Sequence, residues 1–301
     1  ILDEIKQETR ELKKKFGQPR RTGISNQAYD FGREELEPHE RVVVTLSQGG
    51  YIKRIAASTY KNQHRGGKGV ISMKTKEDDP VKHILVVDTH DRLLFLTNRG
   101  RVLSLKSYEL RADMSRNTRG VPVMNVIPLT DEERVNALIS VESLTQENTF
   151  IIMGTRKGAI KRMSLSKISS IRPSGLIIMN LKPDDELVEA KLATIEQDVI
   201  IVSQQGMSIR FPITDIPTRL RAAGGVRGMK LRSGDQVVGM DVAGQESRIL
   251  VISKMGYGKV TAIDKYRRQG RGGFGVKTFN ITSKTGPVAA AEVVKDSTQV
   301  Y

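Results

Sequence analysis

The chain has 301 residues, of which 38% are hydrophobic, with no cysteine and a formal net charge of +15 at pH 7. This length allows a substantial buried core, and the lack of cysteine excludes disulfides, zinc fingers and thiol catalysis. The basic excess makes a polyanion the leading class of partner, against the plainer interpretation of a soluble protein that happens to be basic. No apolar run approaches the roughly 18 residues that a membrane-spanning helix needs, so we expect a cytoplasmic protein with no membrane partner.

Residues 1–16 are predicted to form a short helix. Its apolar residues fall roughly on one helical face, and its basic last turn suits the negative end of the helix dipole. Gly17 and Pro19 then end the helix. Because a helix of this length is marginal alone, we interpret it as the end of a longer structure, followed by a linker over residues 17–39.

From residue 40 onward the sequence repeats about every 50 residues. Each of five copies has an apolar strand, a glycine turn and a second strand ending in basic residues, followed by a second glycine cluster, another strand and an acidic loop. Repeats of this length predict a propeller or a solenoid, and about four short strands per repeat is the number found in one propeller blade. The hairpin-turn glycines, which supply a positive φ, are Gly50, Gly100, Gly158, Gly206 and Gly256.

A sixth unit is predicted to begin near the end of the chain. Residues 287–294 have the pattern of its inner strand, and residues 299–301 that of the start of its hairpin. The chain ends before the turn glycine. Either the last blade is truncated, or residues outside the repeats, such as 24–38, complete it, and the sequence leaves both possibilities open.

The second glycine clusters carry arginine and lysine beside glycine. Glycine lets backbone N–H groups approach a phosphate closely, and the cations neutralise it. Alternatively, the glycines only permit a tight crossing between strands, and the cations are solvated. Both interpretations stay open for copies two to four, whereas the denser motif of the first copy, Gln63-His64-Arg65-Gly66-Gly67-Lys68-Gly69, favours binding.

No catalytic constellation is present in the sequence. Gly67-Lys68 lacks the Ser/Thr of a phosphate-binding Walker loop, and the dinucleotide-like pattern of residues 270–275 precedes a strand rather than a helix. The acidic residues cluster in turns, which we interpret as solvated loops. The four histidines, His39, His64, His83 and His90, show no metal-ligand spacing. We therefore predict no catalytic residue, no metal site and no cofactor in this chain.

The residues from Gln63 to Gly69, set in a four-stranded repeat, closely resemble the gyrase-A box of the C-terminal domain of the DNA gyrase A subunit, with His64 where the box usually has arginine. The helix followed by residues 20–22 resembles the segment where the breakage-reunion part of that protein ends. Thr89-His90-Asp91 and Gly256-Tyr257-Gly258-Lys259 also resemble the family. The A-type subunit of topoisomerase IV typically has a degenerate box, so the near-complete box favours gyrase.

This resemblance implies an all-β, six-bladed β-pinwheel over residues 40–301, in which four-stranded blades exchange strands and the last blade is incomplete. It implies a basic rim that binds, bends and wraps duplex DNA, so that the holoenzyme introduces negative supercoils. The implied partners are double-stranded DNA, the gyrase B subunit and the N-terminal part of the gyrase A subunit in an A2B2 assembly. ATP and Mg would act on other domains. The cleaving tyrosine would lie upstream, so this fragment would not cut DNA, and the isolated domain would be a nucleoid-associated monomer.

Two alternatives remain open at this point. One is the C-terminal domain of the A-type topoisomerase IV subunit, and the other is a propeller scaffold that binds acidic proteins.

If the domain wraps DNA, bending the duplex costs about 1–6 kcal/mol per site of 20–30 bp, which many phosphate contacts must offset. The predicted DNA contacts are Gln63, His64, Arg65, Gly66, Gly67, Lys68, Gly69, Lys53, Arg54, Arg101, Arg116, Arg119, Arg162, Arg221, Arg227 and Arg271.

Overall fold

The computed structural model describes residues 1–18, 33–59, 79–113, 115 and 117–294, which fall into two units divided after Glu37. In the first unit, the helix expected over residues 1–16 is α1 (Leu2–Phe16), where the Gly17 N–H donates to the Lys13 carbonyl at 2.8 Å. A single turn, α2 (Arg33–Leu36), follows. Among the described residues, neither helix has the length and apolar character needed to cross a bilayer.

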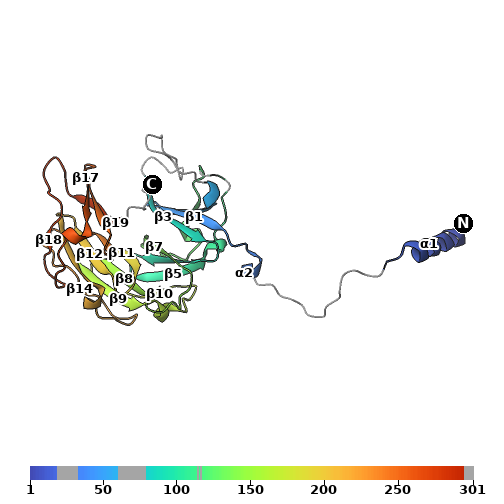
Figure 1. The fold of residues 1–301 in the computed structure, drawn as a ribbon, viewed down its shortest axis with the longest axis horizontal. Coiled ribbons are helices and arrows are strands. Elements are labelled where there is room, and N and C mark those ends of the chain that lie inside the picture. The colour runs from blue at the N-terminus through green and yellow to red at the C-terminus, as the bar shows by residue number, and fades with distance from the viewer. Residues whose placement is uncertain (19–32, 60–78, 114, 116, 295–301) are drawn as a thin grey trace. The chain divides into compact units, whose positions relative to one another are not determined.

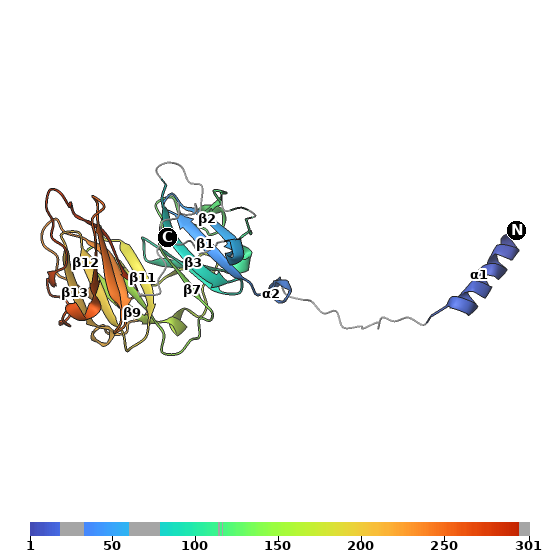
Figure 2. The same ribbon diagram turned by 45° about the horizontal axis from the view of Figure 1, so that its top comes forward.

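The second unit is a propeller-like series of antiparallel sheets that follow one another in chain order (Figure 1; Figure 2). The first sheet has the order β3-β1-β2-β6. Its central hairpin joins β1 (Arg41–Ser47) to β2 (Tyr51–Ala56), with β3 (Val81–Asp88) beside β1 and β6 (Val121–Pro122) beside β2. The turn glycine at its tip, Gly50, has φ +81°, as expected for a tight hairpin.

The other sheets repeat this arrangement. The second, in the order β10-β5-β4-β7, contains β4 (Arg92–Thr97), β5 (Arg101–Lys106), β7 (Val135–Val141) and β10 (Leu176–Ile177). The third, in the order β11-β8-β9-β14, contains β8 (Phe150–Thr155), β9 (Ala159–Ser164), β11 (Leu187–Ala193) and β14 (Val226–Arg227). The fourth, in the order β15-β12-β13-β18, contains β12 (Asp198–Ser203), β13 (Met207–Pro212), β15 (Val237–Ala243) and β18 (Val276–Lys277). Short 3-10 helices lie at Ala57–Thr59, Ser107–Glu109, Val123–Asn125, Leu165–Ile168, Ile213–Asp215 and Ile263–Lys265.

The described residues form five blades, so the prediction of six is wrong. The fifth sheet, in the order β17-β16-β19, contains β16 (Arg248–Ser253), β17 (Gly258–Ala262) and β19 (Val288–Val294). We expected residues 287–294 to open a sixth blade, but β19 pairs with β16 and closes the fifth, with Ile249 opposite Val293. The physical reason is that the long strand after each hairpin, such as β3 or β19, pairs with the hairpin before it in the chain. Counting that strand with the hairpin that follows predicts one blade too many.

Neighbouring blades exchange strands and share their cores. Each two-residue strand β6, β10, β14 and β18 follows the next hairpin in sequence yet pairs with the hairpin before it, as Ile52 opposite Val121 shows. The apolar cluster that contains Val44 of the first sheet also contains Phe95 and Leu103 of the second. Because each blade buries its apolar face against the next, the blades stabilise one another as in other repeat proteins.

The acidic loops fasten the hairpin turns. Asp185 is buried and accepts hydrogen bonds from the Thr155 hydroxyl at 2.7 Å and the Lys157 N–H at 2.9 Å. Asp79 is also buried and accepts a bond from Ser47 at 2.8 Å in the first blade. The interpretation of these acidic residues as solvated therefore fails for both, because each satisfies donors at a hairpin tip.

Candidate nucleic-acid interface

The predicted basic residues at the ends of the first and third hairpins are buried or half-buried. Lys53 on β2 is buried, and its ammonium donates to the Thr118 carbonyl at 3.0 Å. Burial lowers the pKa of Lys53, and the carboxylate of Asp113 only partly opposes this. Arg54 is also buried. Arg162, the corresponding residue on β9, lies over the Phe150 ring at 5.0 Å, and burial lowers its pKa.

Three further predicted residues make intramolecular contacts. Arg101 pairs with Glu133 and donates to the Ser174 carbonyl at 2.6 Å. The Arg119 guanidinium stacks 3.7 Å from the centre of the Tyr51 ring. Arg271 donates to the Arg227 carbonyl at 2.6 Å. These cations hold successive repeats together, and sequence alone could not distinguish that role from phosphate binding.

Of the predicted residues that the structure describes, Arg221 and Arg227 have side chains exposed at the blade edges. Arg227 is the second residue of β14, and Lys277, also exposed, occupies the same position in β18. Because these strands pair with the outer strand of a hairpin, their exposed side chains lie on the rim. Other exposed cations lie in the same glycine clusters or on and just after the exchanged strands. Sequence analysis considered the clusters as phosphate sites but did not include these residues among the predicted DNA contacts: Arg172, Arg219, Lys230, Arg267 and Lys277.

A groove with a volume of about 850 Å³ lies on this rim between the third and fourth glycine clusters. Its cations are Lys167, Arg172 and Arg221, and its apolar lining includes the exposed side chains of Ile177 and Leu220. The predicted box, Gln63–Gly69, and Arg116 lie outside the described residues.

The described glycine clusters allow close crossings between strands. The fifth copy, residues 269–275, shares five of seven residues with Gln63–Gly69. In it, Gly275 has φ +77°, and a Cβ there would stand 2.1 Å from the Ser208 carbonyl oxygen. Gly120 in the second copy has φ +77°, and its Cβ would stand 2.4 Å from the Ile52 carbonyl oxygen. At these positions glycine is required for the crossing itself.

The family model "DNA gyrase C-terminal domain, beta-propeller" matches residues 41–88, 91–142, 149–193, 197–243 and 247–295. The chain belongs to the DNA gyrase A C-terminal domain family. The five matched segments correspond to the five blades, and the resemblance inferred from sequence is confirmed.

Known members of this family are similar over nearly the whole chain. It is 42% identical over 301 residues to the DNA gyrase A subunit of Dehalogenimonas lykanthroporepellens, which covers 100% of this chain and 37% of the relative. The chain is 41% identical over 297 residues to the DNA gyrase A subunit of Staphylococcus epidermidis, and the alignment covers 98% of this chain and 33% of the relative. The chain thus spans about a third of the length of these curated relatives.

Two solved structures resemble the fold. A DNA gyrase A C-terminal domain aligns with a TM-score of 0.71 and 28% identity over 85% of this chain and 84% of that one. The C-terminal domain of a DNA topoisomerase IV aligns with a TM-score of 0.70 and 25% identity over 86% and 79%. The fold is therefore similar to the C-terminal domains of both DNA gyrase and topoisomerase IV, the two possibilities that the sequence left open.

The gyrase C-terminal-domain fold of this chain also contains a charged central channel. A cavity of about 820 Å³ is lined by the inner strands, including β3, β7, β11 and β19. Lys191 lies 3.9 Å from Asp241 and 3.6 Å from Glu292. Burial raises the pKa of Glu189 to about 7, and Lys191 opposes the rise. Burial lowers the pKa of His83 to about 4, and the Lys82 ammonium adds to the decrease.

Glu189→Gln is expected to stabilise the domain above pH 7. A carboxyl whose pKa rises from 4.5 to about 7 on folding contributes stability fully below pH 4.5, and that stability is lost as pH rises through 7. The amide has no such loss, so at pH 8 the variant should exceed wild type by on the order of 1–3 kcal/mol. Urea unfolding at pH 5 and pH 8 measures this, with the exposed Glu196→Gln as control. If the free energy of unfolding of the variant exceeds that of wild type by the same amount at pH 5 as at pH 8, the prediction is contradicted.

Proposed function

We propose that this chain binds duplex DNA non-specifically along its basic rim and wraps it as the C-terminal domain of a DNA gyrase A subunit. The observation that carries the proposal is that exposed cations recur at the outer edges of successive blades, as Arg227 and Lys277 do on equivalent strands. Phosphate contacts of this kind position a duplex without reading its sequence. Contacts distributed around several blades suit a bent duplex, because they offset the bending energy along its whole path.

The remaining parts of the activity belong to the rest of the assembly. In this proposal, the A2B2 holoenzyme with the gyrase B subunit and the N-terminal part of the gyrase A subunit hydrolyses ATP with Mg on other domains and introduces negative supercoils. This chain supplies no catalytic residue, works in the bacterial cytoplasm at the nucleoid, and is monomeric when isolated. The family membership and the basic rim support this division of roles.

Binding should weaken steeply with salt, and the slope should depend on the rim. The slope of log K against log salt is about −0.9 per phosphate contacted, so replacing Arg221 and Arg227 together by alanine should make it shallower by about 1.8. Fluorescence anisotropy with a 40-bp duplex between low and physiological salt measures this. Arg99→Ala is the control, because Arg99 is exposed but pairs with Glu132 at a hairpin turn. A slope that the double substitution leaves unchanged would refute binding through this rim.

Wrapping is tested separately by a topological footprint. The domain is added to nicked plasmid, the nick is ligated, the protein is removed, and the linking number is compared with that of a protein-free control. A stoichiometric positive shift supports chiral wrapping and a gyrase role. Binding without a shift favours the topoisomerase IV alternative, whose C-terminal domain has the same fold. No binding at all favours a scaffold for acidic proteins.

A further inference from the structure

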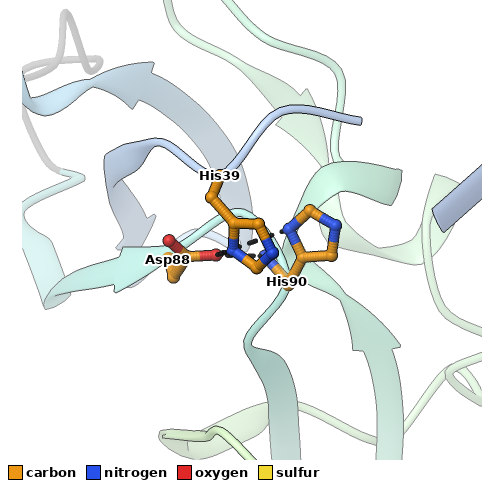
Figure 3. Close-up of side chains that lie close together, drawn as sticks. All are labelled: His39, Asp88 and His90. Atoms are coloured by element: carbon orange, nitrogen blue, oxygen red, sulfur yellow. Dashed lines mark hydrogen bonds and ion pairs between the residues drawn. The ribbon is translucent and has the colours of Figure 1, made fainter. Parts of the chain in front are cut away.

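His39, Asp88 and His90 converge at the start of the first blade, where they fasten the chain rather than form a ligand site (Figure 3). Nδ1 of His39 lies 2.9 Å from Oδ1 of Asp88, which is an imidazole–carboxylate hydrogen bond. The rings of His39 and His90 stack with their centres 3.7 Å apart and their planes at 19°. Nitrogen lone pairs in two such nearly parallel planes do not converge on one ion. These contacts therefore hold the residues before β1 against the turn after β3.

The fourth glycine cluster presents an apolar side chain on the basic rim. Leu220 is 70% exposed and stands between Arg219 and Arg221, which are both exposed as well. A single exposed leucine is ordinary on a protein surface. Leu220 differs because it lines the groove of about 850 Å³ that is also lined by Lys167 and Arg172. Its apolar surface thus lies where these cations would hold a phosphate backbone.

Hydrogen bonds hold the backbone on both sides of Leu220. The Arg219 N–H donates to a backbone carbonyl of β9 at 2.9 Å. The buried Lys161 ammonium donates to the carbonyls of Arg221 at 2.8 Å and Ala223 at 2.7 Å. The Ala223 N–H donates in turn to the Leu220 carbonyl at 3.1 Å. The loop is therefore fixed by its own repeat while the Leu220 side chain stays in solvent, which is how a rigid scaffold presents a contact residue.

An apolar side chain held among cations is the chemistry of proteins that kink a duplex. Such proteins insert Leu, Phe, Ile, Met or Pro between base steps, and the partly unstacked step opens into a kink. Arginine on either side of the inserted residue suits a narrow minor groove, whose negative potential attracts it. Wrapping requires bending, and a kink at one step brings the duplex on both sides of it toward the cations of neighbouring blades.

We propose that Leu220 inserts between two base pairs of the duplex on the rim and kinks it there, with Arg219 and Arg221 against the flanking backbone. The proposal rests on the DNA binding proposed above and adds the residue that bends the duplex. The other four clusters have no apolar side chain at the corresponding position, five residues before the last glycine of each cluster: His64, Ser115, Ser170 and Gly270. Each domain therefore makes one kink of this kind.

The test uses the full 301-residue chain and a 40-bp duplex with one central T·T mismatch beside 2-aminopurine, whose fluorescence rises when the base unstacks. A mismatched step costs less to open, so wild type should bind this duplex roughly tenfold more tightly than the fully paired one. Leu220→Ala should lose most of this preference and the rise in fluorescence. Leu220→Met should keep both, because methionine also inserts between bases. Ile195→Ala is the control, because Ile195 is 49% exposed but lies outside the glycine clusters, between β11 and β12.

Binding to the paired duplex separates the insertion of Leu220 from DNA binding itself. Leu220→Ala keeps Arg221 and Arg227, so its slope of log K against log salt should match that of wild type. Loss of the mismatch preference and of the fluorescence rise in Leu220→Ala, with both kept in Leu220→Met and Ile195→Ala, supports insertion. If Leu220→Ala behaves as wild type, or wild type binds both duplexes equally without a rise in fluorescence, insertion is overturned and the binding function stands. Wild-type protein that binds neither duplex overturns both proposals.

Discussion

Lys161→Met is expected to destabilise the domain by about 3–5 kcal/mol, because it removes three hydrogen bonds from a charged donor, each worth about 1.5–3 kcal/mol before the surroundings adjust. Lys161 on β9 has no exposed surface, and its ammonium donates to the carbonyls of Ile178 at 2.6 Å, Arg221 at 2.8 Å and Ala223 at 2.7 Å. Burial lowers the pKa of Lys161 to about 8, with Arg219 adding to the decrease. At pH 7 the group is still charged, and its three N–H donors match the three acceptors.

Methionine replaces the apolar stem of the lysine but leaves these carbonyls without a partner. The loss should be measured by urea unfolding at pH 7, with Lys167→Met as the control, because Lys167 is exposed six residues further along. The control should stay within about 0.5 kcal/mol of wild type, as surface substitutions usually do. A loss of unfolding free energy below about 1 kcal/mol for Lys161→Met would mean that water satisfies the carbonyls. The ammonium would then not hold together the segments that contain Ile178 and Arg221.

Lys161 shows why charge alone could not locate a DNA surface. Arg210 of the next blade, which lies one strand position further along and corresponds to Arg162, pairs with Asp198 at 2.7 Å and donates to the Ile263 carbonyl at 2.6 Å. Lys53 makes the equivalent backbone contact in the first blade. The second strand of a hairpin thus uses a cation to hold the loop of the next repeat. Sequence analysis assigned Lys53 to DNA, and that contact stays a prediction, while exposed residues such as Arg227 carry the present proposal.

The local features of the fold were predictable because glycine chemistry is local. A tight hairpin requires a positive φ, and the repeat therefore revealed each turn before the structure was known. All five predicted turn glycines have a positive φ: Gly50, Gly100, Gly158, Gly206 and Gly256.

Partners far apart in the sequence were not predictable. The pairing of β19 with β16, which sets the number of blades at five, depends on which hairpin an inner strand chooses. Both choices bury the same apolar residues, so periodicity does not distinguish them. The convergence of His39 with Asp88 has the same origin, because β1 and β3 become neighbours only in the folded sheet.

Gly275→Ala is expected to destabilise the domain by at least about 3 kcal/mol. A left-handed backbone costs an alanine roughly 1–2 kcal/mol, and Gly275 has φ +77°. In addition, the new Cβ would stand 2.1 Å from the Ser208 carbonyl oxygen, where only backbone movement can relieve the contact. That movement would separate β18 from β13, which pair through two residues each. Guanidinium unfolding gives the total loss, and amide exchange at Thr278, whose N–H donates to Gly206, reports the separation.

Two other glycines separate the two effects. Gly234 has φ +74° with nothing within 4 Å of its Cβ position, so Gly234→Ala measures the left-handed backbone alone. Gly270 has open space and no positive φ, so Gly270→Ala should be nearly neutral. The excess of Gly275→Ala over Gly234→Ala then measures the close strand crossing. If the two variants lose the same stability, the crossing does not require glycine, and the glycine clusters would be better explained by the approach of a phosphate to the backbone.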